Sequence, residues 1–407
     1  MNFVQQSGVY KFEWPDYLIR IAVRQLHQHR AGHVTGDITV ETDAPGYPSP
    51  LHGALFNLSS TNTRTQLAKY LTQRYEHADW TGILEELCNT TLQAFRQGED
   101  VVELFSIEER GEPPYLLEPF LFVNKPTVIF GDGGKGKSQL AILISMTLSL
   151  PWSDNDLGLG TNGTHRTKVL YLDYEADESD VAWNMGRFKN GLNIPEVSIN
   201  YRRCSFPLAN DVEEIQRIVA EQGIGCIVVD SLGMACGGEL NTAETAMRFW
   251  NAQRQLKNVT TLVIAHPQKE SLGKKATIHG SGFFSHEARS VWELKQTQEP
   301  GEDDISIGLF HRKVNVGKIH KPLGFRLTFS PHNIKVEKQE VFEVREFRQE
   351  MGTQAQIMGL LKNGAMNVSA LKNELEVSEN AVRQALSKLS KRNKILKVDD
   401  RWGLCLS

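Results

Sequence analysis

The residues with the clearest chemical meaning form a glycine-rich stretch in the first half of the chain. Residues 131–138 read Gly-Asp-Gly-Gly-Lys-Gly-Lys-Ser and match the pattern G-x-x-x-x-G-K-[S/T] in full. The glycines let successive backbone N–H groups point inward at phosphate oxygens. The helix expected to follow directs its positive end at the same anion. This stretch therefore predicts a nucleotide-phosphate loop.

Two side chains of this loop have separate chemical roles. Lys137 carries the ammonium that reaches the β- and γ-phosphates, and Ser138 supplies a hard oxygen ligand for Mg²⁺. The sequence thus predicts ATP and Mg²⁺ as cofactors. Lys135 either adds positive field near the phosphates or is an exposed loop lysine. The residues expected to line the nucleotide are Gly131, Asp132, Gly133, Gly134, Lys135, Gly136, Lys137, Ser138 and Gln139.

Two apolar runs end in the carboxylates that ATP hydrolysis needs. Residues 226–230 end in Asp230, which we expect to hold Mg²⁺. Residues 169–173 end in Asp173, and Glu175 follows as the expected general base for the attacking water. Each acid would also fit a structural role before a turn, and we assign that role to Asp173.

A third run, residues 261–265, is followed by His266, a polar side chain able to sense the γ-phosphate. The next stretch, 267–279, is long, polar and basic, and long loops inside compact domains are often functional. Its lysines are expected to meet a nucleic-acid backbone, although a solvated surface loop would carry the same charge. The candidate DNA contacts in this loop are Lys269, Lys274 and Lys275.

These residues need a scaffold that brings strand ends together, and the chain from residue 120 onward has the corresponding pattern. Short β-branched runs alternate with helical segments, which is typical of βαβ units around a parallel sheet. The expected strands are 127–130, 169–173, 226–230 and 261–265, extended by 290–294, 305–310 and 325–329. The expected helices are 137–149, 177–189, 212–222 and 242–256.

The order of these motifs resembles that of the RecA-fold ATPases, and within them the RepA-like and DnaB-like replicative helicases. The resemblance covers roughly half the chain and includes 131–138, 173–175, 228–231, 266–269, 280–289 and 310–317. It implies an α/β fold with a RecA-like P-loop NTPase core. It also implies that Glu175 activates water, that His266 senses the γ-phosphate, and that the loop after it lines a channel for single-stranded DNA.

Members of that family form rings or filaments with ATP between subunits, and basic residues of the neighbour complete the site as arginine fingers do. The resemblance therefore implies a homo-oligomer, with a hexameric ring as the expected form. By position, Arg312 and Lys313 are the candidate fingers, and Lys318 is a third choice. The basic spacing departs from the family pattern K-x-R-x-G, and a charge-protected edge strand would look the same.

The last part of the chain resembles a winged helix-turn-helix. Helices are expected at 354–362, 368–376 and 379–392, followed by a hairpin of 395–398 and 402–406. Residues 353–407 hold nine Lys/Arg and five Asp/Glu, whereas the whole chain has a net charge of −4. This basic tail predicts contact with duplex DNA, and a dimerisation or docking module is the alternative. The candidate contacts are Lys388, Lys391 and Arg392 beside Ser387, with Lys397 and Arg401 on the wing.

Length and composition limit the remaining choices. A chain of 407 residues with 40% hydrophobic and 23% charged residues is an ordinary globular protein of two or three domains. Its five cysteines include no C-x-x-C pair, which fits a reducing compartment. The sequence predicts no signal peptide and no membrane span, so we expect a cytoplasmic protein without a membrane partner.

The first 115 residues read as a mixed, mostly helical region that governs assembly or partner choice. Helices are expected at 16–29, 63–75 and 81–96, strand and turn at 36–47, and a proline-containing linker at 108–119. The expected domains are 1–115, the ATPase core at 116–340 and the winged-helix domain at 341–407.

Together these features predict an oligomeric DNA-dependent ATPase. The favoured interpretation is a replicative helicase or helicase-like motor that couples ATP hydrolysis at subunit interfaces to movement on single-stranded DNA. Two alternatives stay open. One is a RecA-like recombination or repair ATPase that does not unwind DNA, and the other is a DNA-binding regulator that uses ATP as a conformational switch.

Overall fold

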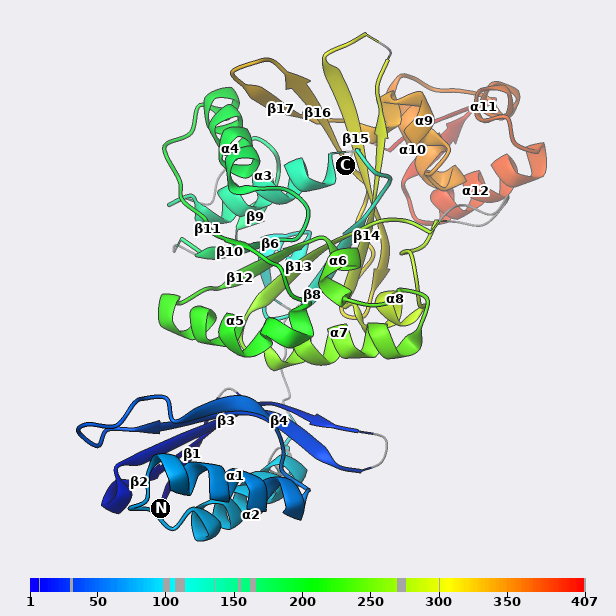
Figure 1. Cartoon of the computed structure of the whole chain (residues 1–407). Helices are drawn as coiled ribbons and strands as arrows, with labels where there is room; N and C mark the ends of the chain where they lie inside the picture. Colours follow the sequence, from blue (N-terminus) through cyan, green and yellow to red (C-terminus); the bar gives the residue numbers. More distant parts are fainter. Residues whose placement is uncertain are drawn as a thin grey trace. The chain divides into compact units, whose positions relative to one another are not determined.

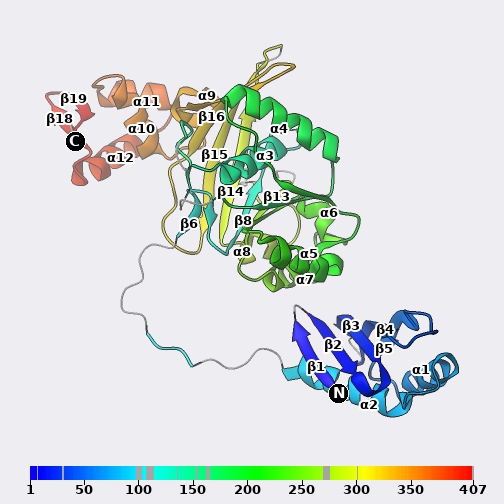
Figure 2. The same cartoon turned by 90° about the vertical axis from the view of Figure 1, so that its left-hand side faces the viewer.

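The computed structural model describes residues 1–6, 8–29, 32–97, 103–106, 114–134, 136–152, 155–161, 166–268, 276–299 and 301–405. The chain divides into two compact units (Figures 1 and 2). The first comprises Met1–Gly111, Phe206–Gly223 and Arg248–Lys257. The second comprises Glu112–Ser205, Ile224–Met247 and Asn258–Ser407.

The N-terminal part is an antiparallel sheet packed on two helices. Its elements are β1 (Asn2–Gln6), β2 (Val9–Trp14), β3 (Ile19–Gln28), β4 (Val34–Thr42), β5 (His52–Asn57), α1 (Thr61–Arg74) and α2 (Trp80–Gln97). The strands lie in the order β1-β2-β3-β4-β5. Every second side chain of β4 is buried, as expected for a sheet with one face on a core. The helices α1 and α2 lie against that sheet and share its core (Figure 1).

The N-terminal region is mixed, as predicted, but the expectation that it is mostly helical is wrong. The helix expected at 16–29 is also wrong, because β3 follows a short 3-10 helix at Pro15–Tyr17. Ile19, Ile21 and Val23 are all buried on one face of β3, which is the two-residue period of a strand. Ile19 and Val23 are also four residues apart, which is the spacing of residues on one face of a helix, so the sequence alone fits a helix as well. The other two helices expected in this region are confirmed as α1 and α2.

The second unit is organised around a nine-stranded sheet. Its strands are β8 (Pro126–Phe130), β10 (Val169–Asp173), β11 (Asn200–Arg203), β12 (Cys226–Asp230), β13 (Thr260–Ala265), β14 (Ser290–Thr297), β15 (Asp304–Val314), β16 (Leu323–Phe329) and β17 (Ile334–Gln339). Their spatial order is β11-β10-β12-β13-β8-β14-β15-β16-β17. The six strands from β11 to β14 run parallel, and the last three continue the sheet antiparallel. The predicted α/β core with a largely parallel sheet is confirmed.

The central strands β8, β10, β12 and β13 are buried along their whole length. A strand buried on both faces reads as an unbroken apolar run, which is the pattern these segments have in the sequence. Helices α3 (Lys137–Ser149) and α4 (Glu178–Leu192) lie side by side and share one hydrophobic core with the strands (Figure 2). The core therefore holds β8 and α3 rigidly on either side of the phosphate loop.

The remaining helices of the central region are α5 (Leu208–Gln222), α6 (Leu232–Cys236), α7 (Ala243–Gln255) and α8 (Phe283–Glu287). A small sheet joins β6 (Tyr115–Glu118), β7 (Leu121–Phe122) and β9 (Gly160–Thr161). The linker expected at 108–119 is therefore wrong in its second half, where Leu117 is fully buried in the main core. The nearby prolines, which usually mark loops, concealed this strand. Residues 108–113 lie outside the described part of the chain.

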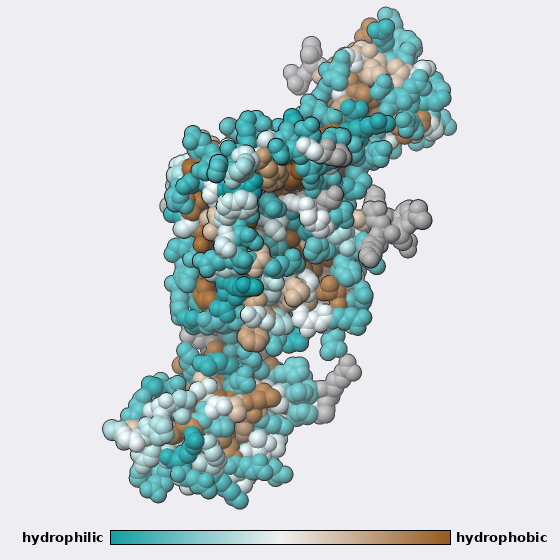
Figure 3. All heavy atoms as spheres, turned by 45° about the horizontal axis from the view of Figure 1, so that its top comes forward, coloured by the Kyte–Doolittle hydropathy of each residue, from teal (hydrophilic) through white to brown (hydrophobic). Residues whose placement is uncertain are grey.

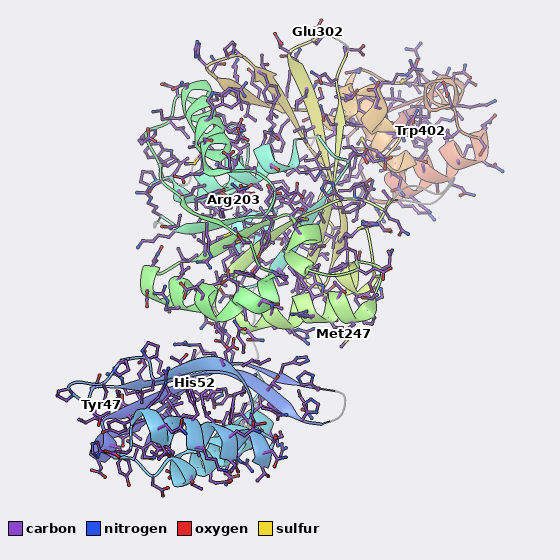
Figure 4. The ribbon with its side chains drawn as sticks, in the orientation of Figure 1. Tyr47, His52, Arg203, Met247, Glu302 and Trp402 are labelled. Carbon is purple, nitrogen blue, oxygen red and sulfur yellow. The ribbon has the colours of Figure 1, made fainter. Side chains whose placement is uncertain are left out.

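The C-terminal tail contains α9 (Arg345–Arg348), α10 (Thr353–Lys362), α11 (Val368–Leu375), α12 (Glu379–Lys391), β18 (Ile395–Val398) and β19 (Arg401–Leu404). The three helices and the hairpin expected from residue 354 onward lie at the predicted positions. The side chains of Asn367 and Ser378 cap α11 and α12. Trp402, labelled in Figure 4, belongs to the hairpin and pairs through its backbone with Met366. Assignment of this tail as a winged helix-turn-helix stays a prediction.

Within the described ranges, no helix combines the length and the apolar character that a membrane crossing needs. The face of the molecule in Figure 3 is mainly hydrophilic, with hydrophobic residues scattered across it. Scattered surface apolar residues are normal for a globular protein.

The contact of α4 with β17 offers a test of this fold. A Cβ added at Gly191 would lie 2.0 Å from the carbonyl oxygen of Ile334, whereas one at Gly186 of the same helix would meet nothing within 4 Å. We expect Gly191→Ala to lower the free energy of unfolding by about 1–3 kcal/mol through overpacking. Gly186→Ala should leave it unchanged or raise it by up to about 1 kcal/mol. Denaturant unfolding measures both values, and equal stabilities would contradict the packing of α4 on β17.

Candidate functional site

The carboxyl ends of four neighbouring parallel strands meet at one edge of the sheet. Phe130 at the end of β8 is paired with Ala265 at the end of β13, and Asp230 of β12 is paired with Asp173 of β10. Strands β12 and β13 are themselves adjacent. The phosphate loop, the two acidic strand ends and His266 therefore start from neighbouring positions. Ligands of open α/β sheets bind at such an edge.

The phosphate loop follows a path that depends on glycine. Gly134 and Gly136 have φ angles of +68° and +83°, a region that disfavours any residue with a Cβ. A Cβ at Gly131 would lie 2.5 Å from the carbonyl oxygen of Leu294 on β14, so only glycine fits there. Gly136 precedes α3 and has no side chain to cap it, which leaves the first N–H groups of that helix open to an anion.

Lys137 is the buried cation of the site. It begins α3, and its Nζ donates to the backbone carbonyl oxygen of Asp132 at 2.6 Å. Burial lowers the pKa of Lys137, while the carboxylates of Asp230, Glu175 and Asp132 act in the opposite direction. The ammonium is thus held inside the loop and within reach of the acids of the adjacent strands. A phosphate in this loop would meet a fixed positive charge.

Asp230 is almost completely buried at the end of β12. Its Oδ2 accepts a hydrogen bond from the Tyr171 hydroxyl at 2.6 Å, and the Ser138 hydroxyl bonds to the same carboxylate. Burial raises the pKa of Asp230, and the bonds from Tyr171 and Ser138 lower it. The structure therefore brings together the two predicted Mg²⁺ ligands, one from the phosphate loop and one from the neighbouring strand. A hydroxyl and a carboxylate are oxygen ligands that Mg²⁺ accepts.

Tyr171 is a residue of the site that was not predicted from the sequence. It sits in the middle of β10, and burial raises the pKa of its hydroxyl well above the ordinary value, with Asp230 adding to that effect. The signal in the sequence is a hydroxyl-bearing aromatic inside an otherwise aliphatic strand. A buried tyrosine of this kind needs a hydrogen-bond partner, and the nearby strand ends supply carboxylates.

Glu175 and His266 lie together at the mouth of the site. The Ser231 hydroxyl donates to Glu175 Oε1, and His266 Nε2 lies 3.7 Å from the same oxygen. The Glu175 side chain is 45% exposed, so its carboxylate meets solvent. A water beside this carboxylate can lose its proton to it. Ser231 was not predicted, although it directly follows Asp230 in the sequence.

Asp173 orders the turn that carries Glu175. Its Oδ1 accepts the backbone N–H groups of Glu175 and Ala176, both at 2.9 Å, and its Oδ2 accepts the Tyr201 hydroxyl at 3.0 Å. Asp173 is also buried. These hydrogen bonds fix the start of the turn after β10, and the structural role expected of Asp173 stays a prediction.

A cleft of about 550 Å³ opens beside these residues. Its lining comes from the phosphate loop, from the segment after β13 and from β14: Gly131, Asp132, Gly133, His266, Pro267, Gln268, Ala276, Glu293, Leu294, Lys295 and Gln296. Gln139, predicted to line the nucleotide, borders a second depression of about 240 Å³ together with Gly134 and Gly136. Figure 4 labels Glu302, which lies at this second depression between β14 and β15.

The loop after His266 has a closed base. The N–H of His279 donates to the carbonyl oxygen of His266 at 2.8 Å, and the N–H of Gln268 donates to that of Thr277 at 2.8 Å. Pro267 and Ile278 form an antiparallel bridge between these two bonds. The basic segment is flanked by Gln268 and Ala276, which both line the cleft. Its lysines, Lys269, Lys274 and Lys275, lie outside the described residues, as does Lys135.

The two candidate fingers are held by their own chain. Arg312 Nε donates to Glu293 Oε2 at 2.6 Å, and Arg312 Nη2 donates to Glu350 Oε2 at 2.6 Å. Lys313 Nζ donates at 2.7, 2.7 and 2.8 Å to the backbone carbonyl groups of Ser285, His286 and Ala288. The remaining predicted DNA contacts, Lys388, Lys391 and Arg392, are exposed at the end of α12 in the tail.

Comparison with known proteins finds a family model that matches part of the core. Residues 92–271 match the family model described as an AAA domain, and this segment contains the phosphate loop, Glu175, Asp230 and His266. The chain therefore carries a P-loop ATPase domain, as predicted. A KaiC-like protein from the hyperthermophilic archaeon Pyrococcus horikoshii matches with a TM-score of 0.36 and 16% identity, over 56% of this chain and 98% of that chain. No curated protein matches the sequence.

The Tyr171 hydroxyl offers a test of the Asp230 site. Tyr171→Phe removes a hydrogen bond that lowers the pKa of Asp230, so the acid limb of the ATPase pH profile should move to higher pH. We expect kcat/KM with Mg²⁺ and ATP to fall roughly tenfold, since a bond to a charged group is lost. The matched control is Tyr201→Phe, which removes the hydroxyl bonded to Asp173. An acid limb that stays in place in Tyr171→Phe would remove the role given to this hydroxyl.

Proposed function

We propose that this protein is an oligomeric, DNA-dependent ATPase of the cytoplasm, a replicative helicase or helicase-like motor. ATP hydrolysis at the edge of the nine-stranded sheet drives movement of the loop after β13 along single-stranded DNA. The observation that carries this proposal is the position of His266. Its imidazole is 3.7 Å from Glu175, and its backbone carbonyl closes the base of the loop that carries the lysines.

The ATP-hydrolysing step assigns one role to each residue of the site. Lys137 binds the β- and γ-phosphates, and the glycine loop surrounds them with backbone N–H groups. Ser138 and Asp230 would hold Mg²⁺, which supplies charge neutralisation at the phosphate oxygens when it is bound. Glu175 takes the proton of the water that attacks the γ-phosphorus. His266, beside Glu175, distinguishes the state with a γ-phosphate from the state without one.

The DNA contacts come from two parts of the chain. The lysines at 269, 274 and 275 meet the backbone of single-stranded DNA, because their loop starts at the nucleotide cleft and carries concentrated positive charge. The tail adds a second contact with duplex DNA through Lys388, Lys391 and Arg392, which are exposed at the end of α12.

The proposal that the protein forms an oligomer is supported by the resemblance to replicative helicases, in which ATP lies between subunits. Arg312 and Lys313 stay the candidate fingers of the hexameric ring. In this structure Glu293 and Glu350 hold Arg312, and carbonyl groups at the end of α8 hold Lys313. To act as fingers, both side chains have to release these partners and bind the phosphates of the neighbouring subunit. Particle images in the presence of ATP give the number of subunits directly.

The function is tested by two measurements on purified protein. We expect single-stranded DNA to accelerate ATP turnover and the protein to displace a strand from a forked duplex in an ATP-dependent manner. Stimulation without strand displacement would favour the recombination or repair ATPase. Slow turnover that DNA does not change, with sequence-specific duplex binding through the tail, would favour the ATP-switched regulator. Either of these results excludes the motor.

The catalytic assignment predicts different losses in two variants. Lys137→Ala should lose ATP binding and turnover together, because a buried phosphate-binding cation is removed. Glu175→Gln should bind ATP normally and hydrolyse it about 10²–10⁴-fold more slowly, because the proton acceptor is removed. The matched control is Glu178→Gln, an exposed acid three residues further along. Normal turnover by Glu175→Gln would exclude it as the general base.

The loop assignment predicts a specific change in salt dependence. A double variant, Lys274→Ala with Lys275→Ala, should weaken binding to single-stranded DNA and reduce the slope of log K against log salt by about 1.4, since each phosphate contact on a single strand contributes about 0.7. Fluorescence anisotropy with a labelled oligonucleotide at several salt concentrations measures this slope. The same slope in the wild type and the double variant would place these lysines away from the DNA.

A further inference from the structure

One wall of the nucleotide cleft carries charges that the proposed mechanism does not use. β14 runs parallel to β8 with Glu293 paired to Phe130, the last residue before the phosphate loop. Lys295 is two residues further on, and both charged side chains line the cleft together with Gly131. The backbone at Leu294, between them, comes so close to Gly131 that only glycine fits there. Lys295 therefore lies alongside the phosphate loop.

Four charged side chains form a closed cluster at this wall. Lys295 Nζ lies 2.5 Å from Glu350 Oε1 and 3.6 Å from Glu293 Oε1. Arg312 bridges the same two acids through Nη2 and Nε. Glu293 is only 4% exposed, so its buried negative charge needs a cation beside it. Arg312 is such a cation and contacts Glu293 through two nitrogens. As long as Arg312 stays on Glu293, Lys295 can therefore leave the cluster without leaving Glu293 unpaired.

Glu350 belongs to the segment that joins the sheet to the C-terminal helices. It follows α9, whose Phe347 is buried against Phe310 of β15. The segment is tied to α10 as well, because Gln356 Nε2 donates to the backbone carbonyl groups of Arg348 and Met351 at 2.7 and 2.8 Å. The closest anion to the Lys295 ammonium thus comes from the connection to the tail and not from the ATPase core.

We propose that Lys295 is a further nucleotide-binding residue and that Glu350 competes with the triphosphate for its ammonium. When Glu350 is in place, the cluster is electrically neutral and adds no attraction for phosphate. When the segment that carries Glu350 moves away, the wall has a net positive charge and Lys295 turns to the phosphates of ATP. This inference rests on the ATP-binding part of the proposed function and on none of its DNA chemistry.

Competition for one ammonium makes two equilibria reciprocal. If docking of Glu350 lowers the affinity for ATP by a certain factor, bound ATP lowers the docking equilibrium constant of the segment after α9 by the same factor. The C-terminal tail is thereby linked to nucleotide occupancy without any contact between the tail helices and the nucleotide. A partner that pulls on the tail would raise the affinity for ATP by the same route.

The test measures the Kd of a non-hydrolysable ATP analogue with Mg²⁺ by calorimetry. Glu350→Gln should tighten binding by about three- to tenfold, the range of a partly exposed ion pair. Lys295→Gln should weaken binding, and adding Glu350→Gln to it should have no further effect, because the shared ammonium is gone. The matched control is Glu340→Gln, an exposed acid paired with Lys362 near the tail, which should leave the Kd unchanged.

Hydrogen exchange supplies the reciprocal measurement. In the wild-type protein, the analogue should accelerate exchange of the backbone amides of residues 346–352. An unchanged or weakened affinity in Glu350→Gln, with normal binding by the wild type, would overturn the competition and leave the ATPase assignment intact. Absence of analogue binding by the wild type would overturn both. An effect of Glu350→Gln that persists in the Lys295→Gln background would show that the ammonium is not shared.

Discussion

The site depends on one carboxylate buried at the end of β12. A buried acid without donors would take up a proton and lose the charge that a metal ion needs. At Asp230, burial raises the pKa, and the hydroxyls of Tyr171 and Ser138 counteract that rise, with the ammonium of Lys137 nearby. Tyr171 belongs to β10, whereas Lys137 and Ser138 are the first two residues of α3. The position of the phosphate loop, the identity of a residue inside β10 and the length of β12 are therefore linked by the same electrostatic requirement.

The strands whose two faces are both buried are the parts of the fold that the sequence predicts best. β10 and β12 have the bounds expected of them, because four buried apolar or aromatic residues followed by an aspartate at a turn leave few alternatives. The edge strands β11 and β17 were not predicted. Asn200–Arg203 has no apolar period, and its extended shape comes from hydrogen bonds to β10. The N-terminal β3 was misread for a related reason, since its buried residues fit both a strand and a helix until its partners are known.

In the site too, the features that depend on local sequence were predicted, and those that depend on contacts between distant segments were not. The phosphate loop, Glu175, Asp230 and His266 follow strand ends, and parallel strands bring their ends to one edge regardless of detail. Contacts such as that of Tyr171 with Asp230 depend on register between strands far apart in the sequence. The ion pairs of Arg312 join residues 19 and 38 positions away, and no local pattern indicates such partners.

The close approach of Gly131 to Leu294 has an optical consequence. Because the backbone of Leu294 leaves no room for a Cβ at Gly131, we expect a shift of the glycine loop to displace β14 as well. Trp292 lies two residues earlier on that strand, is fully buried, and stacks on the ring of His311 with centroids 4.2 Å apart. Indole emission is sensitive to a stacked imidazole, so we expect Trp292, one of seven tryptophans in the chain, to change its fluorescence when the glycine loop moves.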